Sequence, residues 1–341
     1  MSSFIDVHSH VSPLSFPAAP NDKVASRWPC MQCQSSIEGT LMIGETPFRK
    51  LDARSWDVAR RIEDMDRDGV DVQVLSPMPE LLSYWLDVDD AHIVCDATNH
   101  LIASMVSAAP SRFRGLGSVP LQDPHVAARM VSRLKAEFGL VGIEIGSNIN
   151  GKLLGGSEFD PFWEAAEAEG MAVFIHALHP IAAKTLPADV GFTGFALFPV
   201  DTGMTAAAII MAGVLTRFPR LRVAFSHGGG TLGAMLGRLQ LGWLGTNGFE
   251  GKSTIGPIEQ ARQFFYDTNV YDPDYLTYLA TQMAPGQVFA GTDYPYMIMQ
   301  TDPARWIRSI GLPTEAEDSI CSGAAARFLA ETSWTAMTTS R

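Results

Sequence analysis

The amino-acid sequence predicts an α/β fold, a (β/α)8 TIM barrel, on three observations. Short apolar segments rich in β-branched residues recur eight times along the 341 residues. Most of them are too apolar for a sheet with one face in water, so we expect them to be covered on both faces. Stretches with helical spacing of apolar residues separate them, and this alternation is typical of a barrel inside a ring of helices. A doubly wound open sheet is the alternative.

The expected elements alternate along almost the whole chain. The strands are Phe4–His8, Val70–Ser76, Arg114–Val119, Val141–Gly146, Ala172–His176, Arg222–His227, Phe264–Asn269 and Gln287–Thr292. The helices are Ser55–Arg67, Asp123–Phe138, Asp160–Glu169, Thr205–Arg217, Leu232–Trp243, Pro273–Met283 and Pro303–Ile310. Two helices open on Asp-Pro, at Asp123 and Asp160, a pair that suits an N-cap and a first turn.

We expect one domain over residues 1–331, with residues 332–341 as a loose tail. Residues 11–54 interrupt the alternation, because this segment is rich in Pro, Ser and Gly and has no clear helix. We interpret it as an insertion over the C-terminal mouth of the barrel, where active sites of this fold lie. Its Cys30 and Cys33 invite a zinc-site interpretation, but a structural zinc needs two more ligands, so ordinary thiols are favoured.

Composition excludes several classes of function. The net charge of −12 argues against non-specific nucleic-acid binding, which requires neutralised phosphates, but it leaves a small anionic substrate open. The N-terminus has no apolar signal segment, and no stretch approaches about 18 uninterrupted apolar residues, so we expect no membrane segment. Four scattered cysteines fit a reducing compartment, and we expect a cytoplasmic protein.

Five side chains with metal or acid–base chemistry stand at the ends of expected strands. His8 and His10 end the first strand, and residues two apart on a strand share a face. His176, His227 and Asp293 end the fifth, sixth and eighth strands. Taken singly, each histidine could be an ordinary core or surface residue, and Asp293 could simply cap a helix. Together they converge on one mouth, and imidazole and carboxylate suit a first-row divalent metal.

These motifs resemble the amidohydrolase superfamily. More narrowly, they resemble its decarboxylase branch, typified by 2-amino-3-carboxymuconate 6-semialdehyde decarboxylase. The resemblance runs from about Phe4 to Leu329. The segments that carry it are His8-Ser9-His10, Phe48-Arg49, Arg61–Asp66 running into Gly69–Val74, Val119–Asp123, His227–Gly230 through Gly237-Arg238, and Gly291–Pro295.

The resemblance implies a role for each matching residue. His8, His10, His176 and Asp293 would hold one divalent metal ion, zinc in the first instance and manganese as the alternative. His227 would be the general base that activates a water molecule, and we take Asp293 as a second catalytic residue.

The resemblance also implies a homodimer. Arg49 and Arg238 would grip substrate carboxylates, and Arg238 would reach the site from the neighbouring subunit. Binuclear members of the superfamily carry a lysine on strand 4, but here the strand reads Val141–Gly146 without one, so we expect one metal. Glu144 on that strand is an alternative second carboxylate.

The activity we expect is non-oxidative decarboxylation of an unsaturated or aromatic-catabolism carboxylic acid. The alternatives are a hydrolase, such as a lactonase for a ring-cleavage product, and a metal-binding protein without catalysis. The chain departs from the branch after His176, where Ala177-Leu178-His179-Pro180 replaces His-Pro-Trp. The substrate is therefore less defined than the metal site, and His179 is either an extra polar contact or an exposed loop residue.

Overall fold

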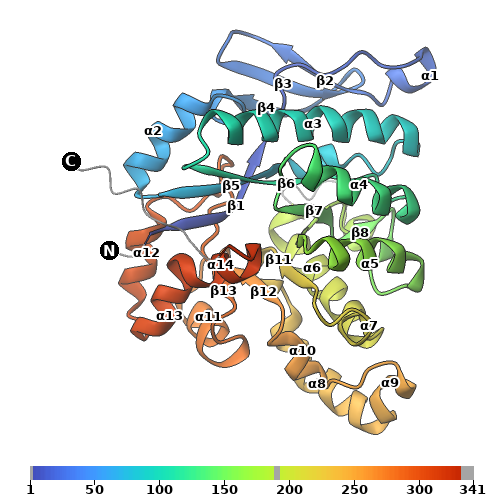
Figure 1. Cartoon of the computed structure of the whole chain (residues 1–341), viewed down its shortest axis with the longest axis vertical. Helices are drawn as coiled ribbons and strands as arrows, with labels where there is room; N and C mark the ends of the chain where they lie inside the picture. The colour runs from blue at the N-terminus through green and yellow to red at the C-terminus, as the bar shows by residue number, and fades with distance from the viewer. Residues whose placement is uncertain (1–2, 188–192, 332–341) are drawn as a thin grey trace.

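The computed structural model describes residues 3–187 and 193–331, and the predicted (β/α)8 barrel is confirmed (Figure 1). Its eight strands lie in chain order and pair in parallel. They are β1 (Ile5–Val11), β5 (Val72–Pro77), β6 (Phe113–Gly117), β7 (Gly142–Gly146), β10 (Ala172–His176), β11 (Arg222–Phe225), β12 (Phe265–Asp267) and β13 (Val288–Phe289). A parallel bridge between Ser9 and Tyr294 joins the last strand region to the first.

Helices surround the strands (Figure 1). Those that follow the strands are α2 (Val58–Asp68), α3 (Val88–Ala108), α4 (Pro124–Ala136), α5 (Asp160–Glu169), α6 (Thr193–Met211), α8 (Leu232–Gly245), α11 (Pro273–Tyr278), α12 (Pro303–Ile310) and α14 (Ala324–Leu329). Shorter helices are α7 (Val214–Arg217), α9 (Asn247–Gly251), α10 (Pro257–Ala261) and α13 (Thr314–Asp318). Asp123 caps α4 as predicted, accepting hydrogen bonds from the backbone of His125 and Val126. Asp160 does not cap α5, because Phe159 occupies the N-cap position.

The helix predictions missed one helix and gave another the wrong bounds. The 21-residue helix α3 was not predicted at all. The predicted helix Thr205–Arg217 is two helices, since α6 begins at Thr193 and a break at Gly213 separates it from α7. Gly213 has a φ of +66°, and a Cβ there would lie 2.0 Å from the carbonyl oxygen of Lys252, so the chain turns where only glycine fits.

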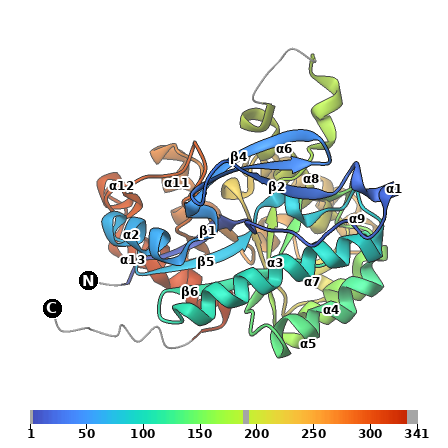
Figure 2. The same cartoon turned by 90° about the horizontal axis from the view of Figure 1, so that it is seen from above.

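Between β1 and α2 the chain forms a small antiparallel sheet, which the sequence did not predict. Its strands are β2 (Pro29–Cys33), β3 (Glu38–Ile43) and β4 (Thr46–Asp52), and the one-turn helix α1 (Asp22–Ala25) precedes them (Figure 2). Leu41 of β3 packs in a cluster with Met78, which follows β5, and with Tyr296, which follows β13. The small sheet therefore contacts the C-terminal ends of two barrel strands.

The barrel interior is apolar along most of the strands and polar at their C-terminal ends. An apolar cluster there has side chains from every strand except β7, together with Phe328 of α14, and it includes Phe174 of β10. The ring of His8 lies 5.0 Å from the ring of Phe174, directly after this apolar layer. The polar site is thus at the C-terminal end of the strands.

Helix α6 has one further property. Among the described residues, it alone is long and apolar enough to cross a membrane, with a mean hydropathy of 1.5 over residues 194–211. Half of that window is buried in the protein. A helix packed on the core of a globular protein meets the same criterion, so the finding carries little weight.

Candidate active site

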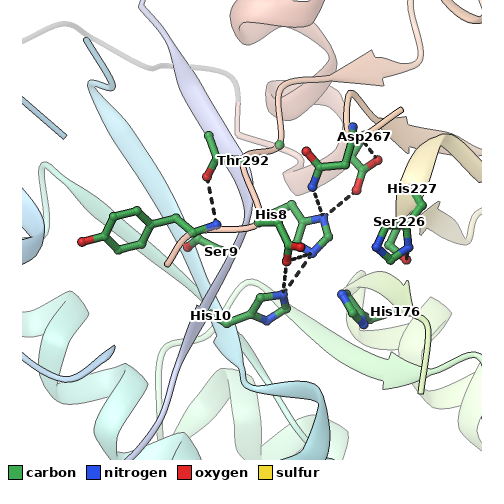
Figure 3. A network of polar contacts seen from close by, with 12 residues as sticks. His8, Ser9, His10, His176, Ser226, His227, Asp267 and Thr292 are labelled. Carbon is green, nitrogen blue, oxygen red and sulfur yellow. Dashed lines mark hydrogen bonds and ion pairs between the residues drawn. The ribbon is translucent and has the colours of Figure 1, made fainter. Parts of the chain in front are cut away.

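Four predicted metal ligands come together at the mouth of the barrel. One donor atom from each of His8, His10, His176 and Asp293 lies within 4.8 Å of all the others, and all four residues are buried (Figure 3). Asp293 Oδ1 lies 3.3 Å from Nε2 of both His8 and His10, and these two nitrogens are 3.0 Å apart. Within the described part of the chain, this is the only such group of three or more possible ligands.

The hydrogen bonds at the far side of each ring decide what this cluster can bind. Nδ1 of His8 lies 2.6 Å from Asp267, Nδ1 of His10 lies 2.9 Å from the carbonyl oxygen of Pro77, and Nδ1 of His176 lies 2.8 Å from that of Ala177. Each acceptor requires a proton on Nδ1, so a neutral ring turns a lone pair at Nε2 toward the cluster.

With all three rings neutral, three lone pairs and a carboxylate oxygen face one another without a donor. Neither Nε2 of His176 nor Oδ1 of Asp293 has a hydrogen-bond partner, although both atoms are buried. Such an arrangement is repulsive unless a cation lies between the atoms. The residues therefore fit a divalent metal ion, which the donor set of nitrogen and oxygen atoms suits.

Proton binding competes with metal binding at this cluster. Burial acts to lower the pKa of His8, but the neighbouring carboxylates of Asp267 and Asp293 outweigh burial and raise the pKa to about 10. Burial lowers the pKa of His10 to about 4 and that of His176 well below its ordinary value. A metal ion must therefore displace a proton from His8, which is the usual linkage at a histidine site.

His227 lies beside the cluster and is not part of it. Its ring centroid is 5.2 Å from that of His176 and 5.9 Å from that of His8. Nδ1 of His227 lies 2.9 Å from Oγ of Ser226, and burial lowers the pKa of the ring, so it is neutral at neutral pH. A neutral imidazole next to a metal site has the protonation state that a general base needs.

Aromatic side chains form two walls of the site. Tyr296 stacks on His10, with centroids 5.1 Å apart and planes 24° apart. The guanidinium carbon of Arg49 lies 4.4 Å from the centre of the same Tyr296 ring. On the other side, Phe198 lies 6.0 Å from His227, centroid to centroid. The structure thus places Arg49 of β4 on Tyr296, which itself contacts His10, and places Phe198 next to His227.

The structure does not bring Arg238 to the site of its own chain. Arg238 lies on the exposed side of α8, whereas Leu232 and Leu236 are the buried residues of that helix. Glu144 of β7 is fully buried under the cluster, where Oε2 lies 3.7 Å from Nδ1 of His10, and burial raises the pKa of the carboxyl to about 8.

Two other predicted features lie outside the cluster. Cys30 and Cys33 are exposed free thiols, and no metal-ligand group that includes them occurs among the described residues. His179 bonds Glu80 at 3.1 Å from a half-exposed position. In the segment after it, helix α6 begins at Thr193, and residues 188–192 lie outside the described residues.

Sequence reasoning missed two buried residues that hold the site. Asp267 ends β12 and contacts His8, and Arg61 of α2 donates hydrogen bonds to the carbonyl oxygen of His10. Arg61 belongs to a segment that resembles the family, so that signal was available. Asp267 ends the observed strand β12, but it lies two residues before the end of the predicted strand Phe264–Asn269, so the strand-end criterion did not select it.

Comparison with known proteins decides the family. A family model described as amidohydrolase matches residues 5–330. The chain belongs to the amidohydrolase family. A 2-amino-3-carboxymuconate-6-semialdehyde decarboxylase of Dictyostelium discoideum is 33% identical to this amidohydrolase over 333 residues, which cover 95% of this chain and 91% of that protein.

Solved structures resemble this amidohydrolase over most of its length. 5-Carboxyvanillate decarboxylase LigW from Sphingomonas paucimobilis is 27% identical, with a TM-score of 0.80, and the match covers 97% of this chain and 99% of that one. A 5-carboxyvanillate decarboxylase from Novosphingobium aromaticivorans is 25% identical, with a TM-score of 0.71 over 81% of this chain and 82% of its own. That structure holds manganese and 3-methoxy-4-hydroxy-5-nitrobenzoic acid.

Proposed function

We propose that this amidohydrolase is a metal-dependent, non-oxidative decarboxylase of an unsaturated or aromatic carboxylic acid, of the carboxymuconate-semialdehyde type. The observation that carries the proposal is the convergence of His8, His10, His176 and the Asp293 carboxylate next to His227. The decarboxylases named among its relatives support the same reaction.

In this proposal, Nε2 of His8, His10 and His176 and Oδ1 of Asp293 hold one divalent ion. A bound ion supplies a Lewis acid that stabilises negative charge on substrate oxygens and lowers the pKa of water. We propose zinc and keep manganese as the alternative, because nitrogen and oxygen donors select weakly between them. The manganese in the Novosphingobium decarboxylase gives the alternative weight.

The chain's own residues bind and protonate the substrate. The Arg49 guanidinium, held on the Tyr296 ring, pairs with a substrate carboxylate, and Phe198 contacts the conjugated part. His227 moves a proton from water to the carbon that bears the carboxylate, with Asp293 as the second catalytic group, and a proton from solvent converts the remaining hydroxide back to water. The C–C bond to the carboxylate then breaks, carbon dioxide leaves, and the bonding electron pair restores the conjugated system.

We also propose that the active form is a homodimer in which Arg238 completes the neighbouring site. Arg238 shares the exposed side of α8 with Leu241 and Leu244, which are 71% and 64% exposed. Leucines at this spacing form an apolar stripe that another surface is expected to cover.

Mixing two inactive variants tests the dimer. His227→Gln and Arg238→Gln each remove one half of the site, and a mixed dimer holds one intact site. Equal mixing and exchange of subunits then restores about a quarter of wild-type activity if the site is shared. If Arg238 serves its own chain, the mixture stays inactive.

The decisive experiment measures carbon dioxide release and metal content on the same sample, against a panel of carboxymuconate semialdehydes and hydroxybenzoates. His176→Ala is expected to lose both metal and activity, whereas His227→Gln keeps the metal and loses activity. His100→Gln, an exposed histidine on α3, is the control and keeps both. A wild-type protein without stoichiometric divalent metal would overturn the proposal.

The arginine assignment has its own test. Arg49→Gln removes a charge-assisted hydrogen bond and is expected to raise KM roughly 10- to 100-fold. Lys50→Gln is the matched control, because neighbouring residues on a strand face opposite sides. Equal KM values for the two variants would remove Arg49 from substrate binding.

A lactonase-type hydrolase on the same site is the second candidate. Ring opening with all carbon retained, and no carbon dioxide, would favour it. Arg49 beside the cluster and the decarboxylases among the relatives favour the first candidate. A metal-binding protein without catalysis is disfavoured, because metal storage needs no neutral His227 beside the ligands.

The remaining proposals concern the whole chain. We propose one catalytic domain over residues 1–331, with residues 11–54 as an insertion, in a cytoplasmic enzyme that acts on small anionic carboxylates and binds neither nucleic acid nor membranes. The predicted tail, residues 332–341, lies outside the described residues.

A further inference from the structure

One buried carboxylate contacts both a proposed metal ligand and the backbone next to the proposed general base. Asp267, at the end of β12, is fully buried. Its Oδ2 accepts a hydrogen bond from Nδ1 of His8 at 2.6 Å (Figure 3). Its Oδ1 accepts one from the backbone N–H of Gly228 at 2.8 Å. Gly228 directly follows His227, so Asp267 lies between a proposed metal ligand and the proposed base.

We propose that Asp267 is a positioning residue that couples metal binding to proton transfer, an inference that rests on the proposed function. Through one oxygen it fixes the tautomer and the ring plane of His8, so that Nε2 faces the metal cluster. Through the other oxygen it holds the backbone that carries His227. Carboxylates that orient metal-binding histidines raise metal affinity, and their loss typically weakens it.

The backbone at His227 needs such a tie. His227 and Gly228 have φ values of +56° and +60°, in the left-handed region that a histidine rarely adopts. A residue keeps this conformation only when its surroundings hold it there. The Gly228 N–H bond to Asp267 is a contact from another strand that fixes this turn, and Ser226 fixes the ring itself through Nδ1.

Other buried carboxylates near the mouth make different contacts. Asp201, 2% exposed, accepts hydrogen bonds from Ser147, Asn148 and the backbone of Ile181. None of these groups is a ring of the cluster. Asp201 is therefore a matched control: it has the same side chain and similar burial, and it also accepts a backbone N–H bond, but it does not contact the metal ligands.

Asp267→Asn separates the two contacts because an amide can satisfy only one of them. If its oxygen accepts from Gly228, its NH2 group faces His8 and forces a proton onto Nε2, which then cannot bind metal. If its oxygen accepts from His8, its NH2 group faces the Gly228 N–H and displaces the turn of His227. Either outcome damages the site in a defined way.

The experiment compares full-length wild type, Asp267→Asn and Asp201→Asn. The metal dissociation constant is measured by competition with a chromogenic chelator, using Co²⁺, whose absorption spectrum also reports ligand geometry. We expect Asp267→Asn to weaken Co²⁺ binding roughly 10- to 100-fold or to lower kcat at saturating metal by a similar factor, with KM unchanged. Asp201→Asn is expected to keep the wild-type dissociation constant, spectrum and kcat.

Wild-type metal affinity together with wild-type kcat in Asp267→Asn would overturn the proposal, as would equal losses in Asp201→Asn. Should Asp267→Asn fail to fold, Asp267→Ser, which is smaller and leaves room for water, gives the same comparison. The Co²⁺ measurement does not depend on the substrate. A wild-type protein that binds Co²⁺ but releases no carbon dioxide would therefore refute the proposed reaction while leaving the role of Asp267 testable.

Discussion

Replacing Arg61 by leucine tests whether helix α2 holds the metal-binding strand. The guanidinium is fully buried and donates to three acceptors: Oε1 of Gln73 at 2.6 Å, the carbonyl oxygen of Arg54 at 2.7 Å and that of His10 at 3.1 and 3.0 Å. Leucine leaves all three acceptors without this donor, two of them buried and the Arg54 carbonyl part-buried. An unsatisfied buried group costs about 1–3 kcal/mol, and the apolar gain of leucine offsets part of the sum.

The expected loss in unfolding free energy is therefore about 3–5 kcal/mol, the range seen when one partner of a buried charged network is removed. The assay is urea unfolding of the metal-free protein, followed by circular dichroism. Arg305→Leu on α12 is the control, because its side chain is 86% exposed and its ion pair is worth less than about 1 kcal/mol. Equal losses for the two variants would refute the argument.

Three further predictions concern the mouth of the barrel. The hydrogen bond to Glu80 raises the pKa of His179. The stabilisation from this ion pair is therefore fully present below the ordinary histidine pKa and is lost as pH rises through the raised pKa. In urea unfolding, His179→Gln should lower the unfolding free energy by less than about 1 kcal/mol at pH 6, and the difference from wild type should vanish by about pH 9. Gly228→Ala would place a Cβ 2.2 Å from Val270 and should lose activity, whereas Gly139→Ala, with open space, costs only about 1 kcal/mol and keeps activity. Chelation should lower the melting temperature, since a metal at 1,000 times its dissociation constant contributes about 4 kcal/mol, and an unchanged melting temperature would contradict a specific site.

The sequence predicted the barrel because burial of parallel strands leaves a composition that can be recognised locally. Ala172–His176 was predicted with its observed bounds, since an apolar strand between two turns needs no tertiary information. Helix α3 was not predicted because its apolar residues do not form a clear stripe along one face. It is covered by the barrel on one side and by Val24 and Trp28 of the inserted segment on another, so it is apolar on more than one face.

The direction of His8 and His10 could be predicted only in part. Residues two positions apart on a regular strand share a face. The pairing of β1 with β5, however, shifts in register between Asp6 and Ser9. Asp6 bonds Gln73, which in turn contacts Arg61 of the outer helix α2. Without this shift, alternation would place His8 on the outer face with Asp6. The irregularity turns both histidines into the barrel, as bulges near active sites do. No local sequence pattern predicts this shift in register.

The shift also explains why the site depends on residues on both sides of β1. Once the ring of His10 points inward, its carbonyl oxygen points to α2, where Arg61 binds it. The ring of His8 is held from the inner side by Asp267. Each supporting residue belongs to a different helix or strand from the histidine it holds, more than 50 positions away along the chain. Metal ligands at strand ends can therefore be recognised from sequence, whereas the groups that fix their geometry become evident only when the barrel is closed.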